Sequence, residues 1–570
     1  MLGISPWLSL VVVLLVVLLA RRAIRDDDAP APPEAREPTR APSAAERLAD
    51  RVRTMTASDW APPIAGLLTG AATWYVWGSL RRTPVIHDES AYLLQAQLFA
   101  RLHWTAATPP LPHFFEQLYV NLVPAISSKY PPGTSLLLAP GVAVGLPGLP
   151  VVVMNALAGA LVFALARRLL GGVSAALGWT LWITSYPVLY YHAMYVSEVP
   201  SSLAWLLAWW GVLRWRASGR IAGLAVSAGA VALCAITRPL TAVALSIALA
   251  GAVLASLARD AQLTPRALLR VAAPFAVAGA LAVGFLTLWN WRSTGDPRLS
   301  PLTLYTRTYV PFDKLGFGST AAEAPTARLP WDQRVTSVGF YQEHLIHTVP
   351  KLPLVTLVRA RTVAHDMWYD WRGGLAVMAL LGLVGAPAAV WVGVMALVVQ
   401  LLCYLLYAHS WSWSLYYIEL QPLLAAVTAL GIARACMWGA GRDAGARRHA
   451  LATAVLIVAV LYPAAVTVSQ VRAHIAGDHD FYDSFARLLP RAPGGSIVFV
   501  RYATSHNDGL SLVRNAPVLA DAPVWTVYDR GAENARLMAL APERAAYLFD
   551  EATWTLRPLT RTADPVRSTR

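Results

Sequence analysis

The chain has 570 residues, of which 56% are hydrophobic and only 14% are charged, and its net charge is +14. A soluble protein of this length would need far more charge to cover its surface, so the composition excludes the ordinary globular classes. The apolar residues form runs of roughly 20, the length that crosses a bilayer as a helix. Because the arginines stand in short loops between these runs, they follow the positive-inside pattern of membrane proteins rather than the pattern of a nucleic-acid surface.

The first apolar run lies within residues 1–21 and is followed by a basic stretch. No positive charge precedes this run and no small-residue cleavage site follows it, so we expect an anchor helix rather than a signal peptide. Residues 22–58 are rich in Pro, Ala, Arg and acids, without apolar periodicity. They predict a disordered cytoplasmic linker.

Residues 59–470 are predicted to be an all-α transmembrane domain, which together with the anchor gives about 12–13 membrane helices. The apolar segment 134–147 is short, and its length leaves open whether it spans the membrane or dips in and returns. The predicted spans of this domain are 61–80, 149–166, 173–190, 198–213, 221–237, 240–257, 268–289, 373–387, 389–408, 416–437 and 449–470.

The basic loops set the expected topology. With these loops in the cytoplasm, parity places residues 81–133, 290–372 and 471–570 outside. We therefore expect a multi-pass protein of a bacterial-type inner or plasma membrane, whose functional residues face the extracytoplasmic side. The basic loops are 167–172, 214–220, 258–270 and 434–449.

The tail, residues 471–570, differs in composition from the rest of the chain. It is mixed polar, with short β-like runs at 496–500, 524–528 and 545–549 and an amphipathic stretch at 481–489. This pattern predicts a small extracytoplasmic α/β domain. We expect it to recognise the acceptor or to cap the outer cavity, since no nucleophile–base spacing is visible in it.

Two adjacent carboxylates, Asp88 and Glu89, follow the first span of the main body, with Tyr92 shortly after them. Ionised groups near a membrane interface are costly unless they are solvated or used. A plain solvated loop is the competing interpretation.

Lys129 and Tyr130 begin a Lys-Tyr-Pro-Pro-Gly sequence directly before the short apolar segment. A lysine at this boundary can simply extend its charged end to the membrane surface. The functional interpretation is a cation held rigidly where the phosphate of a lipid would lie.

Arg238 lies in a Thr-Arg-Pro turn between two apolar runs. An arginine is always ionised and binds phosphate with two parallel hydrogen bonds. The alternative is an ion pair with Glu198, which is expected on the same face and could itself simply cap a helix. Glu419 is a further charged residue near that face.

In this order, the motifs resemble the GT-C superfamily of integral membrane glycosyltransferases. The likeness is to the branch of protein O-mannosyltransferases and aminoarabinose transferases, that is, glycosyltransferase family 39 and relatives. The Asp-Glu pair and the Lys-Tyr-Pro-Pro motif are its specific part, and Asn290, which opens Asn-Trp-Arg-Ser-Thr-Gly-Asp-Pro, also fits. The resemblance covers about residues 61–440. It departs at 416–422, where relatives often carry Arg-Tyr and this chain has Tyr-Tyr.

The resemblance implies transfer of a sugar from a polyprenyl-phosphate donor to a hydroxyl of an acceptor glycan, lipid or protein, with inversion at the anomeric carbon. Asp88 would be the general base, and Glu89 would orient the acceptor or support Asp88. Lys129 and Arg238 would bind the donor phosphate, which leaves as a stable anion and needs no general acid. The residues expected to bind substrate are Tyr92, Tyr130, Glu198 and Asn290.

No cofactor is required by this scheme, although a divalent metal stays an option because distant relatives use one. Membrane lipids are expected partners, and nucleic acid is not. The alternative function is a polytopic lipid or sugar transporter or flippase, since intramembrane Arg and Glu residues also mark transport paths. No pair of inverted halves is visible in the sequence to support it.

Overall fold

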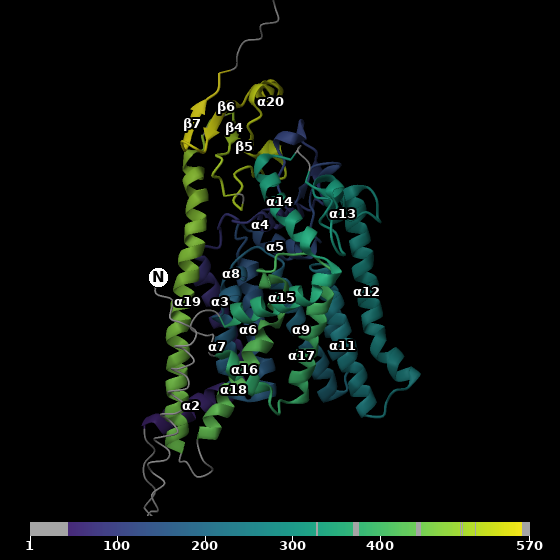
Figure 1. The fold of residues 1–570 in the computed structure, drawn as a ribbon, viewed down its shortest axis with the longest axis vertical. Helices are drawn as coiled ribbons and strands as arrows, with labels where there is room; N and C mark the ends of the chain where they lie inside the picture. Colours follow the sequence, from purple (N-terminus) through teal and green to yellow (C-terminus); the bar gives the residue numbers. More distant parts are fainter. Residues whose placement is uncertain are drawn as a thin grey trace, which may run out of the picture.

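The computed structural model describes residues 44–325, 329–368, 375–439, 446–490, 492, 494–507 and 509–560 of the chain. They form a bundle of long helices with a small sheet beyond one end (Figure 1). The prediction of an all-α membrane body with a small C-terminal α/β part is therefore confirmed. The anchor predicted for residues 1–21, and the linker as far as residue 43, lie outside the described residues.

Each predicted span coincides with one helix, except that 173–190 is divided at Thr184 and Ser185 and 416–437 begins in a 3-10 helix. Pro239 opens its helix directly after Arg238, because proline lacks only the N–H that a first helical turn leaves unused. The helices of the bundle are α3 (Ala61–Trp77), α6 (Leu149–Leu170), α7 (Gly172–Ile183), α8 (Tyr186–Tyr191), α9 (Glu198–Ser218), α10 (Ala222–Ala235), α11 (Pro239–Arg259), α12 (Pro265–Thr294), α16 (Leu375–Leu383), α17 (Ala388–Tyr404), η5 (Ser414–Leu420), α18 (Gln421–Gly439) and α19 (Ala446–Leu488).

Within the described ranges, four helices are long and apolar enough to cross a membrane: α6, α11, α12 and the stretch Ser414–Ala435. The pair α16 and α17, which is bent by 118°, makes a fifth if it is counted as one span. Three further apolar helices, among them α5 (Gly133–Ala143), are shorter. An 11-residue helix is about 16 Å long, roughly half of a bilayer core, so α5 does not span on its own. This answers the question that the sequence left open for residues 134–147.

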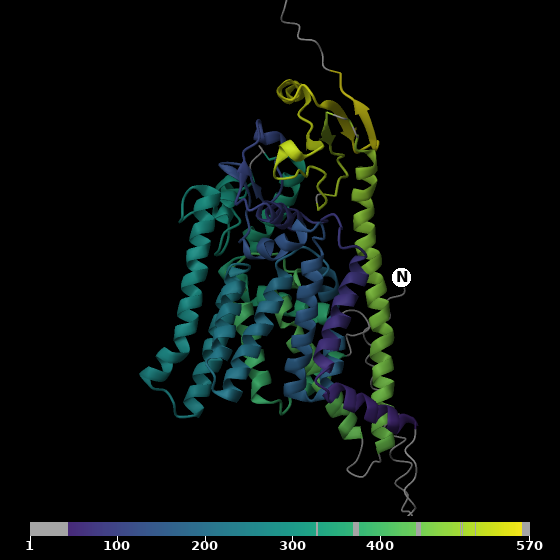
Figure 2. The same ribbon diagram turned by 180° about the vertical axis from the view of Figure 1, so that it is seen from behind.

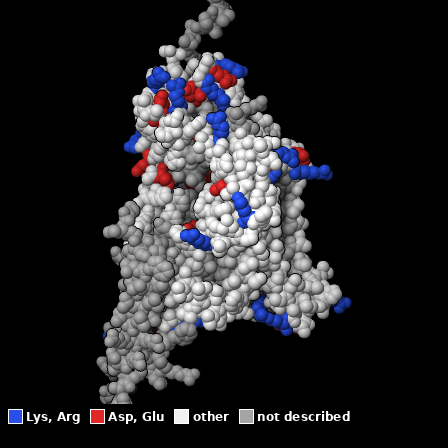
Figure 3. All heavy atoms as spheres, viewed as in Figure 1, with Lys and Arg blue, Asp and Glu red and all other residues white. Residues whose placement is uncertain are grey.

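The segments between the bundle helices sort to its two ends. The helices α4 (His87–Ala100), α13 (Pro301–Tyr309) and α14 (Trp331–Ile346) gather beside the sheet (Figures 1 and 2). The turn between α11 and α12 lies at the opposite end. On the face seen in Figure 3, charged side chains are most numerous over the sheet end, several lie around the middle of the face, and a few basic ones lie along the opposite edge. The three segments expected outside thus share one end, which we call the outer end.

Short elements build the layer that covers the outer end of the bundle. In the first outer segment, β3 (Ala125–Ser128) pairs antiparallel with β1 (Ala106–Ala107) and β2 (Val120–Asn121), and this small sheet leads directly to Lys129. The other elements of this layer are η1 (Pro112–Phe114), η2 (Ala321–Glu323) and η3 (Val349–Lys351), whereas α15 (Leu352–Met367) packs against α8, α18 and η5 of the bundle.

The tail forms a four-stranded sheet of order β5-β4-β6-β7. The first three strands are parallel and coincide with the three predicted runs, whereas β7 is antiparallel to β6. The elements of the tail are β4 (Ser496–Arg501), η6 (Leu519–Asp521), β5 (Val524–Tyr528), η7 (Gly531–Glu533), α20 (Asn534–Leu540), β6 (Ala545–Asp550) and β7 (Thr555–Pro558).

The tail sheet shares its hydrophobic core with the outer layer. One cluster of buried side chains joins Leu94 of α4 and Phe115 of the first outer segment to Ile497 and Val527 of the sheet. The boundary predicted at residue 471 falls inside α19, because this helix continues unbroken from the bundle to the sheet although its residues become polar on the way. The amphipathic stretch 481–489 is the end of the same helix. Removing the tail would therefore expose apolar surface of the outer layer.

Part of the predicted linker is helical. Residues Ala44–Ala57 form α2, which packs against α3, α7 and α19. Apolar residues at positions 48, 52 and 55 have helical spacing, a short periodicity that the overall polar composition of the segment obscured. A disordered linker up to residue 58 is therefore wrong for this part.

Candidate active site

The side chain of Glu89 completes the first turn of α4. Ile86 precedes the helix and has no side-chain oxygen to cap it, so the Glu89 carboxylate accepts from the backbone N–H groups of Val85 at 2.7 Å and Ile86 at 3.2 Å. Its other oxygen accepts from the N–H of Tyr195 at 2.9 Å, shortly before α9. Burial raises the pKa of Glu89 to about 7 against these hydrogen bonds. The geometry gives Glu89 a structural role in place of the predicted catalytic one.

Asp88, one residue earlier, has a different partner. Its Oδ1 atom accepts a hydrogen bond from the hydroxyl of Tyr130 at 2.5 Å. Burial raises the pKa of Asp88, although the Tyr130 hydrogen bond and the positive charge of Lys129 act in the opposite direction. Since a raised pKa makes a carboxylate more basic, Asp88 has the property that acceptance of a proton requires.

Lys129 lies in a cage of aromatic rings and is only 6% exposed. Its Nζ atom is 3.8 Å from the ring centre of Tyr119, 5.1 Å from that of Tyr130 and 5.2 Å from that of Tyr305. Tyr130 in turn stacks on Tyr92, with ring centres 4.5 Å apart. Burial lowers the pKa of Lys129, and neighbouring carboxylates oppose this shift. Four of the predicted residues, Asp88, Tyr92, Lys129 and Tyr130, thus form one cluster, which we call the outer cluster.

A second carboxylate, Asp313, joins the outer cluster from the loop after α13. Its Oδ2 atom lies 3.9 Å from Lys129 Nζ, and its Oδ1 atom lies 3.8 Å from His344 Nε2. The sequence analysis did not select Asp313, because it stands in a long polar loop without a motif around it. Only the folding of that loop over the bundle brings it to Lys129.

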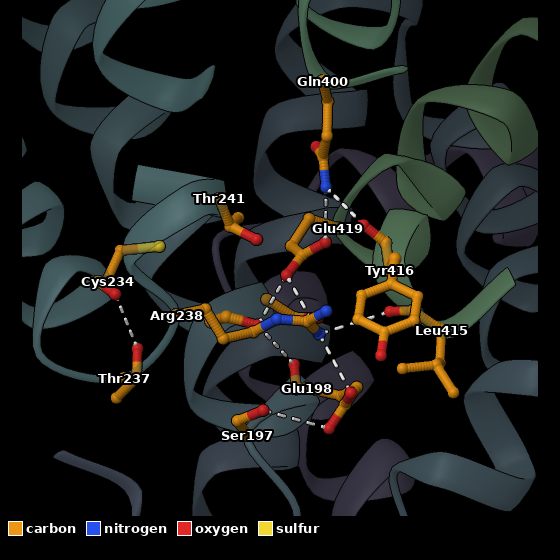
Figure 4. Close-up of polar contacts among 12 residues, drawn as sticks. Ser197, Glu198, Cys234, Thr237, Arg238, Thr241, Gln400, Leu415, Tyr416 and Glu419 are labelled. Atoms are coloured by element: carbon orange, nitrogen blue, oxygen red, sulfur yellow. Dashed lines mark hydrogen bonds and ion pairs between the residues drawn. The ribbon is translucent and has the colours of Figure 1, made fainter. Parts of the chain in front are cut away.

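Arg238 lies at the start of α11, between two carboxylates (Figure 4). Its NH1 atom donates to Glu198 Oε1 at 3.0 Å and to the carbonyl of Leu415 at 3.2 Å, and it is 3.6 Å from Glu419 Oε1. Glu419 also accepts from Ser201 at 2.6 Å and from Gln400 at 2.9 Å. All three charged side chains are buried. We call Arg238, Glu198 and Glu419 the ion cluster.

In the ion cluster, the guanidinium of Arg238 already donates to Glu198 and to the carbonyl of Leu415, so these donors are not available to a phosphate. The arrangement favours the alternative noted for Arg238, an interhelical ion pair with Glu198, over the predicted binding of the donor phosphate. It likewise occupies Glu198, which was expected to bind substrate. The three charges hold α9, α11 and η5 together.

Two tyrosines connect the clusters. Tyr92 stacks on Tyr130 and has a hydrogen bond with Ser197, the neighbour of Glu198. The ring of Tyr416 lies 5.5 Å from the guanidinium carbon of Arg238. Tyr416 also packs against Tyr407, with ring centres 5.8 Å apart. The Tyr-Tyr sequence, which departs from the relatives, therefore supplies a side chain between the two clusters.

Asn290 is placed apart from these clusters by its own contact. Its side-chain amide donates to the carbonyl of Pro297 at 3.1 Å, which closes the turn after α12. This hydrogen bond supports a structural role in place of the predicted binding of substrate. Within the described parts of the chain, no three His, Cys, Asp or Glu side chains come together in an arrangement that could hold a metal ion.

Arg514, from the tail, holds the segment that leads into α4. Its guanidinium donates to the carbonyls of Pro84 and Val85, the latter at 2.6 Å, and stacks on Tyr482 at 4.1 Å. The Tyr482 hydroxyl donates to the same Val85 carbonyl at 2.8 Å. Because Glu89 binds the N–H groups of this segment and Arg514 binds its carbonyls, the position of Asp88 depends on the tail.

Arg514→Ala is expected to reduce turnover by about tenfold or more, since small displacements of a catalytic group are costly. Binding of the donor lipid should change little, because Arg514 does not contact Lys129. Arg501→Ala is the matched control, as this half-exposed arginine pairs with Asp529 and Asp550 inside the tail. Steady-state kinetics of the three proteins in detergent would measure the effect, and equal rates would show that the tail does not position Asp88.

The structure resembles solved structures of membrane enzymes, although no family model and no curated protein matches the sequence. ArnT from Cupriavidus metallidurans, bound to undecaprenyl phosphate, is 11% identical over 87% of this chain and 94% of its own, with a TM-score of 0.45. Arabinosyltransferase EmbB from Mycobacterium smegmatis is 13% identical over 85% of this chain and 45% of its own, with a TM-score of 0.39.

A third structure is the archaeal oligosaccharyltransferase AglB from Archaeoglobus fulgidus, in complex with an inhibitory peptide and a dolichol-phosphate. It is 12% identical over 77% of this chain and 62% of its own, with a TM-score of 0.35. These three proteins are glycosyltransferases of the GT-C superfamily.

Proposed function

We propose that this protein is an inverting glycosyltransferase, which transfers a sugar from a polyprenyl-phosphate donor to an acceptor hydroxyl on the extracytoplasmic side of the membrane. The observation that carries the proposal is the outer cluster. It places a carboxylate of raised pKa, Asp88, beside a buried amine, Lys129, at the outer end of the helix bundle. The sequence motifs that resemble family 39 contain both residues.

Asp88 is the general base of the proposed reaction. It accepts the proton of the acceptor hydroxyl while the hydroxyl oxygen forms a bond to the anomeric carbon. The bond from that carbon to the phosphate oxygen breaks, and the phosphate leaves with the electron pair. Because the attack comes from the side opposite the leaving phosphate, the configuration at the anomeric carbon inverts. Tyr130 keeps the Asp88 carboxylate in position through its hydroxyl.

Lys129 is the proposed ligand of the donor phosphate. Its ammonium group has three N–H donors, and among the described residues it makes no hydrogen bond of 3.5 Å or less through Nζ. Its charge is close to Asp88, so the leaving phosphate would lie near the reacting hydroxyl. A fixed cation there stabilises the charge that develops on the phosphate. Arg238 supports the site and does not contact the donor in this scheme.

An apolar crevice supports a donor with a lipid chain. It has a volume of about 150 Å³ and lies among α6, α9, α11, α17 and α18. Trp205 and Trp209 line the crevice. Arg216 and Arg259 line it at the end away from the outer end of the bundle, and Glu419 of the ion cluster lines it at the opposite end. The lining has the apolar character of a prenyl chain, and a cavity of this volume holds a small part of such a chain.

The proposal predicts that the purified protein carries a polyprenyl phosphate, with or without a sugar, which mass spectrometry of the extracted lipids would identify. Lys129→Met should reduce the bound amount about tenfold, because it removes a charged hydrogen bond to the phosphate. Lys351→Met, which changes an exposed lysine at the same end of the protein, should leave it unchanged. Wild-type protein that retains only bilayer phospholipids would contradict the proposed donor.

A further inference from the structure

Asp313 and His344 face each other at the edge of the outer cluster without a direct hydrogen bond. The two closest atoms, Asp313 Oδ1 and His344 Nε2, are 3.8 Å apart. The other carboxylate oxygen lies 3.9 Å from Lys129 Nζ. At these separations the polar atoms are too far apart for a direct hydrogen bond, and the oxygen atom of a third group can bridge them.

The hydrogen bond of the other ring nitrogen determines what His344 can do. Its Nδ1 atom lies 2.9 Å from the carbonyl of Phe340, and because a carbonyl only accepts, Nδ1 carries a proton. In the neutral ring, Nε2 is then an acceptor. His344 is 4% exposed, and its Nε2 atom is buried without a hydrogen-bond partner. A buried acceptor that faces a carboxylate is costly unless a donor group comes between them.

The chemistry of these three groups selects the kind of ligand. Asp313 and His344 Nε2 accept hydrogen bonds, whereas the Lys129 ammonium donates them. Adjacent hydroxyl groups fit this arrangement, because each one donates to one acceptor and can accept from the amine. A phosphate without protons could use only the amine, because Asp313 and His344 Nε2 offer it no donor. Aromatic rings complete the surroundings, since Phe312 packs against His344 at 5.0 Å and Tyr305 lies beside Lys129.

We propose that Asp313 and His344 form a subsite for adjacent hydroxyl groups of the donor's sugar, next to the amine that binds the phosphate. This inference rests on the proposed function. The sugar is bonded directly to the phosphate, so a hydroxyl subsite within 4 Å of Lys129 is at the right place for it. Asp313 and His344 then decide which sugars are accepted, while Asp88 and Lys129 serve any donor of this class.

The test compares the binding of two lipids, undecaprenyl phosphate and undecaprenyl phosphate linked to mannose, to protein in nanodiscs. The wild-type protein should bind the mannosyl lipid more tightly than the bare phosphate. Asp313→Asn and His344→Gln should each lose about tenfold in affinity for the mannosyl lipid, because each removes an acceptor for a sugar hydroxyl. His344→Gln should leave the affinity for the bare phosphate unchanged, and Asp313→Asn should leave it unchanged or raise it, because it removes a negative charge 3.9 Å from Lys129 Nζ. Asp296→Asn, an exposed carboxylate in the same outer segment, is the matched control.

The outcomes separate this inference from the proposed function. A wild-type protein that binds neither lipid would refute the function and the subsite together. A wild-type protein that binds the bare phosphate, combined with variants that bind both lipids as it does, would refute the subsite alone. An equal loss for both lipids would show that the residues only support the fold. If Asp313→Asn does not fold, His344→Gln gives the same comparison, and the arabinosyl lipid extends the test to a second sugar.

Discussion

Asp88→Asn should fold normally and bind the donor lipid as the wild-type protein does, yet lose about 10²–10⁴-fold in turnover, the usual effect of removing a general base. Asparagine keeps the shape of the side chain and can still accept a hydrogen bond from Tyr130. It cannot take the proton of the acceptor hydroxyl. Single-turnover transfer from a bound donor would measure the loss, because it separates chemistry from binding.

The dependence of the rate on pH is a second test of Asp88 as the general base. In the wild-type protein, kcat/KM should fall as the pH falls through the pKa of Asp88, which burial places above its ordinary range. Tyr130→Phe removes a hydrogen bond that favours the ionised carboxylate, so this decline should move to higher pH. In Asp88→Asn, the decline should be absent from the residual rate.

Glu89→Gln is the control for Asp88→Asn, since it changes the neighbouring carboxylate in the same way. It leaves a backbone N–H without its acceptor and should cost about 1–3 kcal/mol in the free energy of unfolding. Turnover per folded molecule should stay within a few-fold of wild type. A well-folded Asp88→Asn protein with wild-type transfer would overturn the assignment, and Glu198 would be the next carboxylate to test.

Arg238→Ala should destabilise the protein by about 3–5 kcal/mol, the cost of removing one partner from a buried ion pair. It would leave Glu198 and Glu419 buried near each other without their cation. Thermal unfolding of the purified proteins in detergent would measure the effect. The stability of Arg238→Lys should lie between those of the wild type and Arg238→Ala. Lysine keeps the charge but not the planar donors that reach Glu198, Leu415 and Tyr404.

A double variant tests this explanation directly. Glu198→Gln alone leaves Arg238 and Glu419 as a balanced pair, so it should cost less than Arg238→Ala. Combined with Arg238→Ala, it removes one of the two unpaired carboxylates and should restore part of the lost stability. Additive effects would contradict the ion cluster. If Arg238→Lys instead has normal stability but binds undecaprenyl phosphate more weakly, Arg238 is a ligand of the donor phosphate, as the sequence predicted.

Much of the fold could be predicted because its causes are local. The spans, the strands of the tail and the grouping of the outer segments follow from runs of apolar residues and from the placement of arginines. The break between α7 and α8, the helix α2 and the continuity of α19 were missed. A short break, a single helical repeat on a polar segment and a helix that continues beyond the membrane leave only weak traces in composition.

The sequence by itself determined that this is a multi-pass membrane protein and selected Asp88, Lys129 and Arg238 as its unusual charges, since a charge beside long apolar runs is visible without any partner. Only the tertiary structure decided their roles. Whether a carboxylate is a base or a cap depends on which donors face it, and Asp88 faces a tyrosine hydroxyl while Glu89 faces backbone N–H groups. Likewise, the partners of Lys129 and Arg238 come from segments far away in the chain, such as Asp313 and Glu419. Distances between such segments are set by how the helices pack, and no local pattern of residues encodes them.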